Sequence, residues 1–168
     1  RSTAPSVIDG WAYLRQAQAG AVAKDEAAGL VVTIDVGEAD DIHPGDKKTV
    51  GQRMALHALA DVHGQDVVAD GPVAQQAERT DTGVRITFEH ATGLRLNERH
   101  GNPSQTFAIS DADGTWYWAR PMVEDGAIVL TSDAKQPTTV RYAMQINPPS
   151  VLYNAAGLPA VPFEIEVD

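Results

Sequence analysis

The chain has 168 residues and no cysteine, and its 13 Lys and Arg residues against 23 Asp and Glu residues give a net charge of -10. This length suffices for one domain or two small ones, and the lack of cysteine excludes disulfides and thiol catalysis. The acidic charge disfavours a nucleic-acid backbone or an anionic membrane surface as a partner. The apolar runs are far shorter than a membrane span, and residues 1–20 show no secretory signal pattern.

The first predicted element is a helix over residues 11–19. Trp11 and Leu14 lie three residues apart, as on one face of a helix, and Asp9 or Gly10 is placed to cap its start. Residues 1–9 are mostly small and polar, which predicts a loop before this helix.

The stretch 33–48 follows an apolar run that predicts a buried strand over residues 29–35. In open α/β sheets, ligands and catalytic groups collect at the carboxyl ends of the strands. Pro44 disfavours the helical region of backbone space for His43, so we expect this imidazole to be held on an extended residue. The stretch 33–48 is therefore the main candidate for chemistry in the chain.

A second helix is predicted over residues 47–63. Asp46 can accept hydrogen bonds from the amides of the first turn, and Gly64 is a natural residue to end the helix. Apolar residues recur with the helical period and form a stripe along this segment. The stripe consists of Val50, Met54, Ala55, Ala58, Leu59 and Val62.

Beyond Asp66 the apolar period changes from about 3.6 residues to about 2, which is typical of strands. Alternating runs separated by turn signals cover residues 84–88, 94–96, 127–130, 139–144 and 163–167. Short strands at this spacing favour an antiparallel β-sandwich. The sequence therefore predicts an α/β part over residues 1–66 and a β-rich part over residues 67–168.

His43 is the candidate general base, because a catalytic imidazole needs a fixed position and an acceptor for its second ring nitrogen. Asp40, three residues earlier, can fold back to supply that acceptor, and Asp41 is the alternative. The competing interpretation is an acidic surface turn with a bystander histidine. Asp40, Asp41, His43 and Asp46 also offer oxygen and nitrogen ligands, but their spacing matches no metal motif, so neither a metal nor a cofactor is predicted.

Other candidate residues receive a structural interpretation. His57 and His63 are assigned to the second helix and its end. Trp116 and Trp118 share one strand face and could stack on a sugar, but packing within the core is the favoured interpretation. No serine lies in a Gly-x-Ser-x-Gly elbow, so the nucleophile that His43 would serve is missing.

The stretch 35–48 (DVGEADDIHPGDKK) and residues 50–56 resemble the fifth sequence block of the sialate O-acetylesterase-like branch of the SGNH hydrolases. Residues 11–18 resemble the helix that precedes this block in the family. The later segments that resemble the family are Asp70-Gly71-Pro72 and residues 140–143, 147–148, 152–154 and 157–163.

This resemblance implies a flavodoxin-like α/β esterase core with attached β-sandwich material, and a serine hydrolase that removes acetyl groups from sugars. It implies that His43 is the base and that Asp40 is the aspartate of the Asp-x-x-His pattern, with Asp41, or a Ser-His dyad without an orienting carboxylate, as the alternative. The family's blocks that carry the serine nucleophile and the oxyanion hole are absent here. We therefore expect this chain to be the C-terminal part of an esterase whose N-terminal part, on another fragment or chain, supplies both.

The resemblance also implies an acetylated carbohydrate substrate, either sialic acid or a plant polysaccharide such as xylan or xyloglucan. It implies a secreted or periplasmic location, and neither nucleic acid nor a membrane is expected as a partner. The alternative function is a non-catalytic sugar-binding or structural β-sandwich module, in which the acidic loop only caps a helix.

Overall fold

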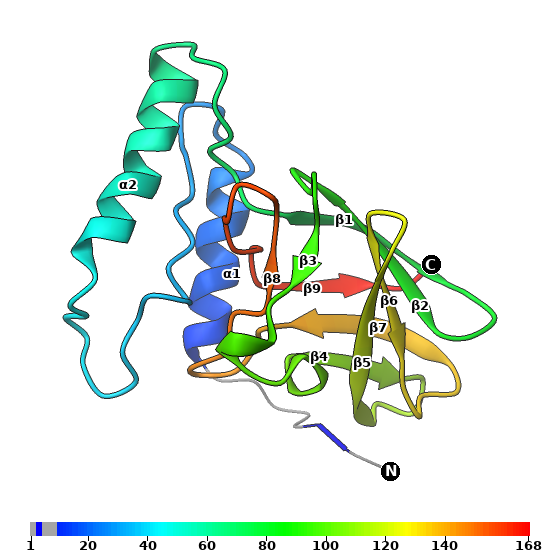
Figure 1. The fold of residues 1–168 in the computed structure, drawn as a ribbon. Helices are drawn as coiled ribbons and strands as arrows, with labels where there is room; N and C mark the ends of the chain where they lie inside the picture. Colours follow the sequence, from blue (N-terminus) through cyan, green and yellow to red (C-terminus); the bar gives the residue numbers. More distant parts are fainter. Residues whose placement is uncertain (1–2, 5–9) are drawn as a thin grey trace.

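The computed structural model describes residues 3–4 and 10–168 (Figure 1). The predicted cap Asp9 and most of the predicted N-terminal loop therefore lie outside the described residues. The fold is mostly antiparallel β, with two helices on one side of the β-rich part (Figure 1).

The two predicted helices are confirmed as α1 (Gly10–Val22) and α2 (Lys47–His57). α2 continues as a single π-helical turn over Ala58–Val62. Asp46 caps its start, as predicted, because its side chain accepts a hydrogen bond from the amide of Thr49. Gly64 follows the end of the helix with a φ of +63°, the left-handed conformation that glycine adopts without strain.

The predicted change to antiparallel strands is also confirmed. The strands are β1 (Val73–Arg79), β2 (Val84–Glu89), β3 (Arg95–Leu96), β4 (Phe107–Asp111), β5 (Trp116–Glu124), β6 (Ala127–Thr131), β7 (Pro137–Tyr142), β8 (Leu152–Tyr153) and β9 (Phe163–Glu166). Two short 3-10 helices, Glu98–His100 and Pro103–Gln105, lie between β3 and β4.

Most of the β-rich part is one curved sheet rather than the expected pair of sandwiched sheets. Seven strands follow one another in the order β1-β2-β6-β5-β4-β7-β9, and a bridge between Ala77 and Val167 brings the two ends together. β5 joins the two halves, because its first residues pair with β4 and its residues from Arg120 onward pair with β6. Strands β3 and β8 form a separate two-stranded sheet.

The hydrophobic core lies inside this curved sheet. Tyr142 is fully buried, with its ring centroid 4.8 Å from that of Phe107 and 5.6 Å from that of Phe163. The Tyr142 hydroxyl accepts hydrogen bonds from the amides of Val151 and Leu152, and so fixes the start of β8. Burial of each large apolar side chain contributes about 1.5–3 kcal/mol, so this core accounts for the stability of the β-rich part.

The predicted strand over residues 29–35 is wrong. This segment runs along α2 and belongs to no sheet that the structure describes. Its carbonyls bond to α2 instead: Arg53 Nη1 donates to the Val32 oxygen at 2.7 Å, and His57 Nε2 lies 3.2 Å from the Leu30 oxygen. A parallel strand requires a neighbouring strand to satisfy its backbone groups, and the described strands are antiparallel and lie in the β-rich part. The expected flavodoxin-like core is therefore not seen.

Both helices turn apolar side chains toward solvent. On α1, Trp11 and Leu14 are exposed. The exposed fraction is 60% for Met54 on α2 and 77% for Val62 in the π-helical turn that continues α2. The face of α2 that packs against the chain carries the buried Arg53 instead. The apolar stripe that predicted α2 therefore lies mostly on its outer face.

Candidate active site

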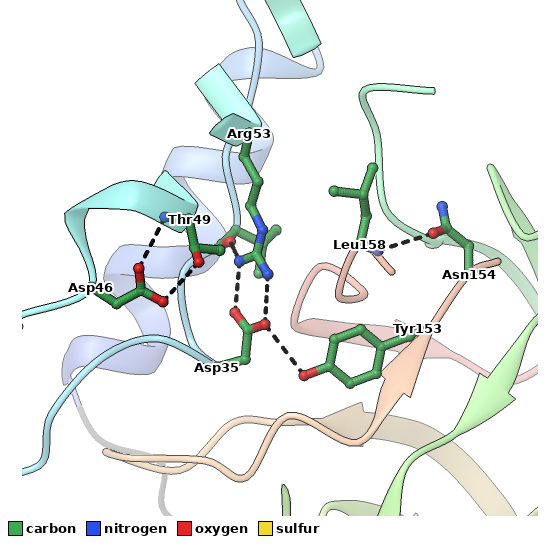
Figure 2. A network of polar contacts seen from close by, with 8 residues as sticks. Asp35, Asp46, Thr49, Arg53, Tyr153, Asn154 and Leu158 are labelled. Carbon is green, nitrogen blue, oxygen red and sulfur yellow. Dashed lines mark hydrogen bonds and ion pairs between the residues drawn. The ribbon is translucent and has the colours of Figure 1, made fainter. Parts of the chain in front are cut away.

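Residues 36–46, which we call the histidine loop, are ordered by their own carboxylates. Glu38 Oε1 accepts a hydrogen bond from the amide of Gly45 at 2.7 Å, and Asp41 Oδ1 accepts one from the amide of His43 at 2.7 Å. At the end of the loop, the Asp46 carboxylate accepts from the amide of Thr49 at 2.9 Å and from its hydroxyl at 2.7 Å (Figure 2). These hydrogen bonds define the turn that presents His43.

Thr49 also affects the acidity of Asp46. The hydrogen bond from its backbone amide favours the ionised carboxylate and lowers the pKa of Asp46 below its ordinary value of 3.8. The cap is therefore fully charged at neutral pH, where it complements the positive end of the α2 dipole.

The imidazole of His43 points into solvent, with 81% of its side chain exposed. Its Nδ1 lies 3.6 Å from Asp41 Oδ1, a distance longer than a hydrogen bond. Asp40 makes no hydrogen bond or ion pair with any residue that the structure describes. The structure thus brings Asp41, the alternative partner, next to His43, and does not bring Asp40 there.

Below the histidine loop lies a buried ionic contact that sequence reasoning missed. Arg53 from α2 bonds to both carboxylate oxygens of Asp35, at 2.7 and 2.6 Å, and only 9% of the Arg53 side chain and 7% of the Asp35 side chain are exposed (Figure 2). Tyr153 from β8 donates its hydroxyl to the same carboxylate at 3.3 Å. The signal in the sequence was weak, because Asp35 and Arg53 are 18 residues apart and Asp35 and Tyr153 are 118 apart.

Burial raises the pKa of Tyr153 to about 12, and the neighbouring Asp35 carboxylate adds to this effect. The phenol therefore stays protonated, and remains a donor to Asp35, at every pH at which an esterase works. Beside this contact, a cavity of about 260 Å³ opens between Ile34 and Asp35 on one side and residues 147–150 on the other.

Other candidate residues lie in structural surroundings. His57 Nδ1 lies 3.0 Å from Asp61 Oδ2, and its ring packs against the segment before the histidine loop. Trp116 is buried, and the guanidinium of Arg141 lies 3.7 Å from its ring centroid, so this face is not available for stacking on a sugar.

No three His, Asp or Glu side chains converge as metal ligands within the described part of the chain. Neither α1 nor α2 combines the length and apolarity needed to cross a bilayer, and the same holds for the shorter helical turns described.

Comparison with known proteins finds a similar solved structure but no matching family model. No family model matches the chain, and no curated protein matches it in sequence. Among solved structures, the fold is similar to that of a carbohydrate acetylesterase from Xanthomonas citri, with a TM-score of 0.82 and 34% sequence identity over 92% of this chain. The chain spans 36% of the length of that esterase, so the similarity is to a part of it.

Proposed function

We propose that this chain is the base-bearing part of a carbohydrate O-acetylesterase. The observation that carries the proposal is its 34% identity and TM-score of 0.82 to part of a carbohydrate acetylesterase. A histidine presented to solvent on an ordered loop beside a carboxylate supports the same reaction class, since ester hydrolysis by a serine needs such a base.

In the proposed reaction, a serine from another part of the enzyme attacks the acetyl carbonyl. His43 takes the proton of the serine hydroxyl and passes it to the departing sugar oxygen. Amide groups outside this chain would hold the oxyanion. Asp41, and in a rearranged loop Asp40, would orient the imidazole and stabilise its protonated form.

The serine and the oxyanion hole are assigned to a further polypeptide segment, N-terminal to the histidine loop. Two observations support such a partner. Apolar side chains of α1 and α2 face solvent, and large exposed apolar surfaces usually mark an interface. In addition, the backbone amides of residues 29–33 donate no hydrogen bond to a residue that the structure describes, so a neighbouring segment could accept from them.

The substrate is proposed to be an acetylated sugar, sialic acid or a plant polysaccharide of the xylan or xyloglucan type. The net charge of -10 disfavours a strongly anionic glycan, because like charges repel in the encounter complex. A secreted or periplasmic location belongs to this proposal, since such polysaccharides lie outside the cell.

The direct test is His43→Ala in the assembled enzyme, assayed with 4-nitrophenyl acetate and with an acetylated xylo-oligosaccharide. Loss of the base should lower kcat about a thousandfold or more, with the unfolding temperature unchanged. His63→Ala is the matched control, because His63 is an exposed histidine just after the π-helical turn that continues α2, outside the histidine loop. Near-normal turnover by the His43 variant would contradict the proposal.

The composition of the native enzyme provides a second test. An intact-mass measurement of the source protein should detect a serine-bearing segment, either in the same polypeptide or as a co-purifying one. A lone, monodisperse 17.9 kDa species that binds glycans would favour the non-catalytic module instead.

A further inference from the structure

We infer that Asp35, Arg53 and Tyr153 are positioning residues that set where the histidine loop stands relative to the β-rich part. The catalytic consequence of this inference rests on the proposed function. The contacts that position the loop are independent of that function. None of the three side chains is a candidate to contact the substrate ester, and each acts through the loop that carries His43.

Asp35 and Arg53 close the base of the histidine loop. Asp35 immediately precedes Val36, the first residue of the loop, and Arg53 lies in α2, the helix that follows it. Their two parallel hydrogen bonds, at 2.7 and 2.6 Å, fix the distance between the two ends of the loop (Figure 2). Arg53 Nη1 also holds the Val32 carbonyl at 2.7 Å, so the segment that leads into the loop is fixed as well.

Tyr153 connects this base to the other part of the molecule. Its hydroxyl reaches Asp35 Oδ2 from β8, which pairs with β3. The guanidinium of Arg95, from β3, lies 6.0 Å from the centroid of the Tyr153 ring. The path from β3 to α2 therefore runs through the Asp35 carboxylate, which receives three hydrogen bonds from the residues that the structure describes.

The bonds within the loop cannot perform this task. Glu38 with Gly45, and Asp41 with His43, hold the shape of the turn, but both contacts are exposed to solvent and lie within the loop itself. Exposed polar contacts are weak because water competes for both partners. The orientation of His43 relative to the rest of the enzyme therefore depends on the buried contact at the base.

Tyr153→Phe is the sharpest test, because it removes one hydroxyl and leaves the ring in place. In the assembled enzyme we expect kcat, per titrated active serine, to fall about tenfold with KM within about twofold, since one hydrogen bond to a charged group is lost. Hydrogen exchange of the peptide covering residues 36–46 should become faster. The matched control is Tyr117→Phe, because Tyr117 is also a buried tyrosine of the β-rich part but has no contact with Asp35.

The two measurements separate this inference from the proposed function. If the wild-type assembly hydrolyses no acetyl ester, the proposed function fails, and the exchange measurement alone decides whether Tyr153 positions the loop. Unchanged exchange over residues 36–46 in Tyr153→Phe would overturn the inference. Faster exchange with an unchanged kcat would overturn its catalytic consequence. Asp35→Asn, which keeps the shape but removes the charge, should exceed the effect of Tyr153→Phe in both measurements.

Discussion

At the scale of single residues, the central feature is the pairing of His43 with a carboxylate. The Asp-x-x-His pattern selects Asp40, whereas the folded loop places Asp41 Oδ1 3.6 Å from the imidazole and against the His43 amide at 2.7 Å. Asp41 therefore both lies near the imidazole and fixes the backbone of His43. In the absence of substrate, catalytic hydrogen bonds are often longer than in the reacting complex.

We predict that Asp41→Asn lowers kcat/KM for an acetyl ester more than Asp40→Asn does. The expected loss is about 10- to 100-fold for Asp41→Asn, since an orienting carboxylate supports the general base. The two variants should be compared in the assembled enzyme with the same substrate and with matched unfolding temperatures. A larger loss for Asp40→Asn would show that the loop rearranges on assembly and that the sequence pattern gives the correct partner.

At the scale of elements, the start of α2 sets the end of the histidine loop. Because the pKa of Asp46 is lower in the folded chain than its ordinary value of 3.8, its stabilising effect is fully present above that value. The effect is lost as the pH falls through the lower, folded pKa. We expect Asp46→Ala to melt at a lower temperature than the wild type at neutral pH, and this difference to shrink in acid.

The measurement for this prediction is the thermal unfolding midpoint from neutral pH down to below 3.8. Asp66→Ala is the control, because Asp66 is an exposed aspartate that makes no hydrogen bond or ion pair in the described part of the chain. A melting difference that stays constant across the acid range would show that the carboxylate charge does not matter at this cap.

Substitution of glycine by alanine should have opposite effects on stability at Gly71 and at Gly51. A Cβ added at Gly71, just before β1, would lie 2.0 Å from the carbonyl oxygen of Pro159, so backbone must move. A Cβ added at Gly51, within α2, would meet nothing within 4 Å. We expect Gly71→Ala to destabilise the chain by about 1–3 kcal/mol and Gly51→Ala to stabilise it by about 0.5–1 kcal/mol. Denaturant unfolding of both variants provides the comparison, and a neutral Gly71→Ala would contradict the close approach.

At the scale of the whole molecule, the outer faces of the helices are the main unexplained surface. Trp11 and Leu14 on α1, Met54 on α2 and Val62 in the turn that continues α2 are exposed apolar residues. Both helices lie on the same side of the β-rich part (Figure 1). Covering them with the proposed serine-bearing segment would remove this apolar area from water.

We predict that Leu14→Glu and Met54→Glu each weaken assembly with that segment at least about tenfold, because a buried unpaired charge is costly. Binding between the two polypeptides is the measurement, or the unfolding midpoint where they form one chain. Met122→Glu should have no effect, because Met122 is an equally exposed methionine on β5 in the β-rich part. Equal effects of all three substitutions would indicate general destabilisation rather than an interface.

Local physical chemistry made several features predictable from the sequence. The periodicity of apolar residues predicted both helices, and alternation predicted strands such as β2. Asp46 marked the start of α2, and Gly64 marked the end of the π-helical turn that continues it. β4 was not predicted, because its apolar run is only Phe107–Ile109 and is followed by Ser110 and Asp111, whereas β6, equally buried on both faces, has a longer apolar run. β1 was not predicted from the sequence either, because most of its apolar positions are small alanines among glutamines and charged residues.

The sequence by itself determined the helices, most of the strand segments and the presence of His43 in an acidic loop, because these depend on neighbours a few residues apart. Only the tertiary structure decided how those pieces combine. It left residues 29–35 without a strand partner, since pairing requires a neighbour in space, and it joined seven of the strands into one nearly closed sheet. It also brought the Tyr153 hydroxyl into hydrogen-bonding distance of Asp35, which is 118 residues away in the sequence. A buried carboxylate needs such donors, and only the folded chain decides which residues supply them.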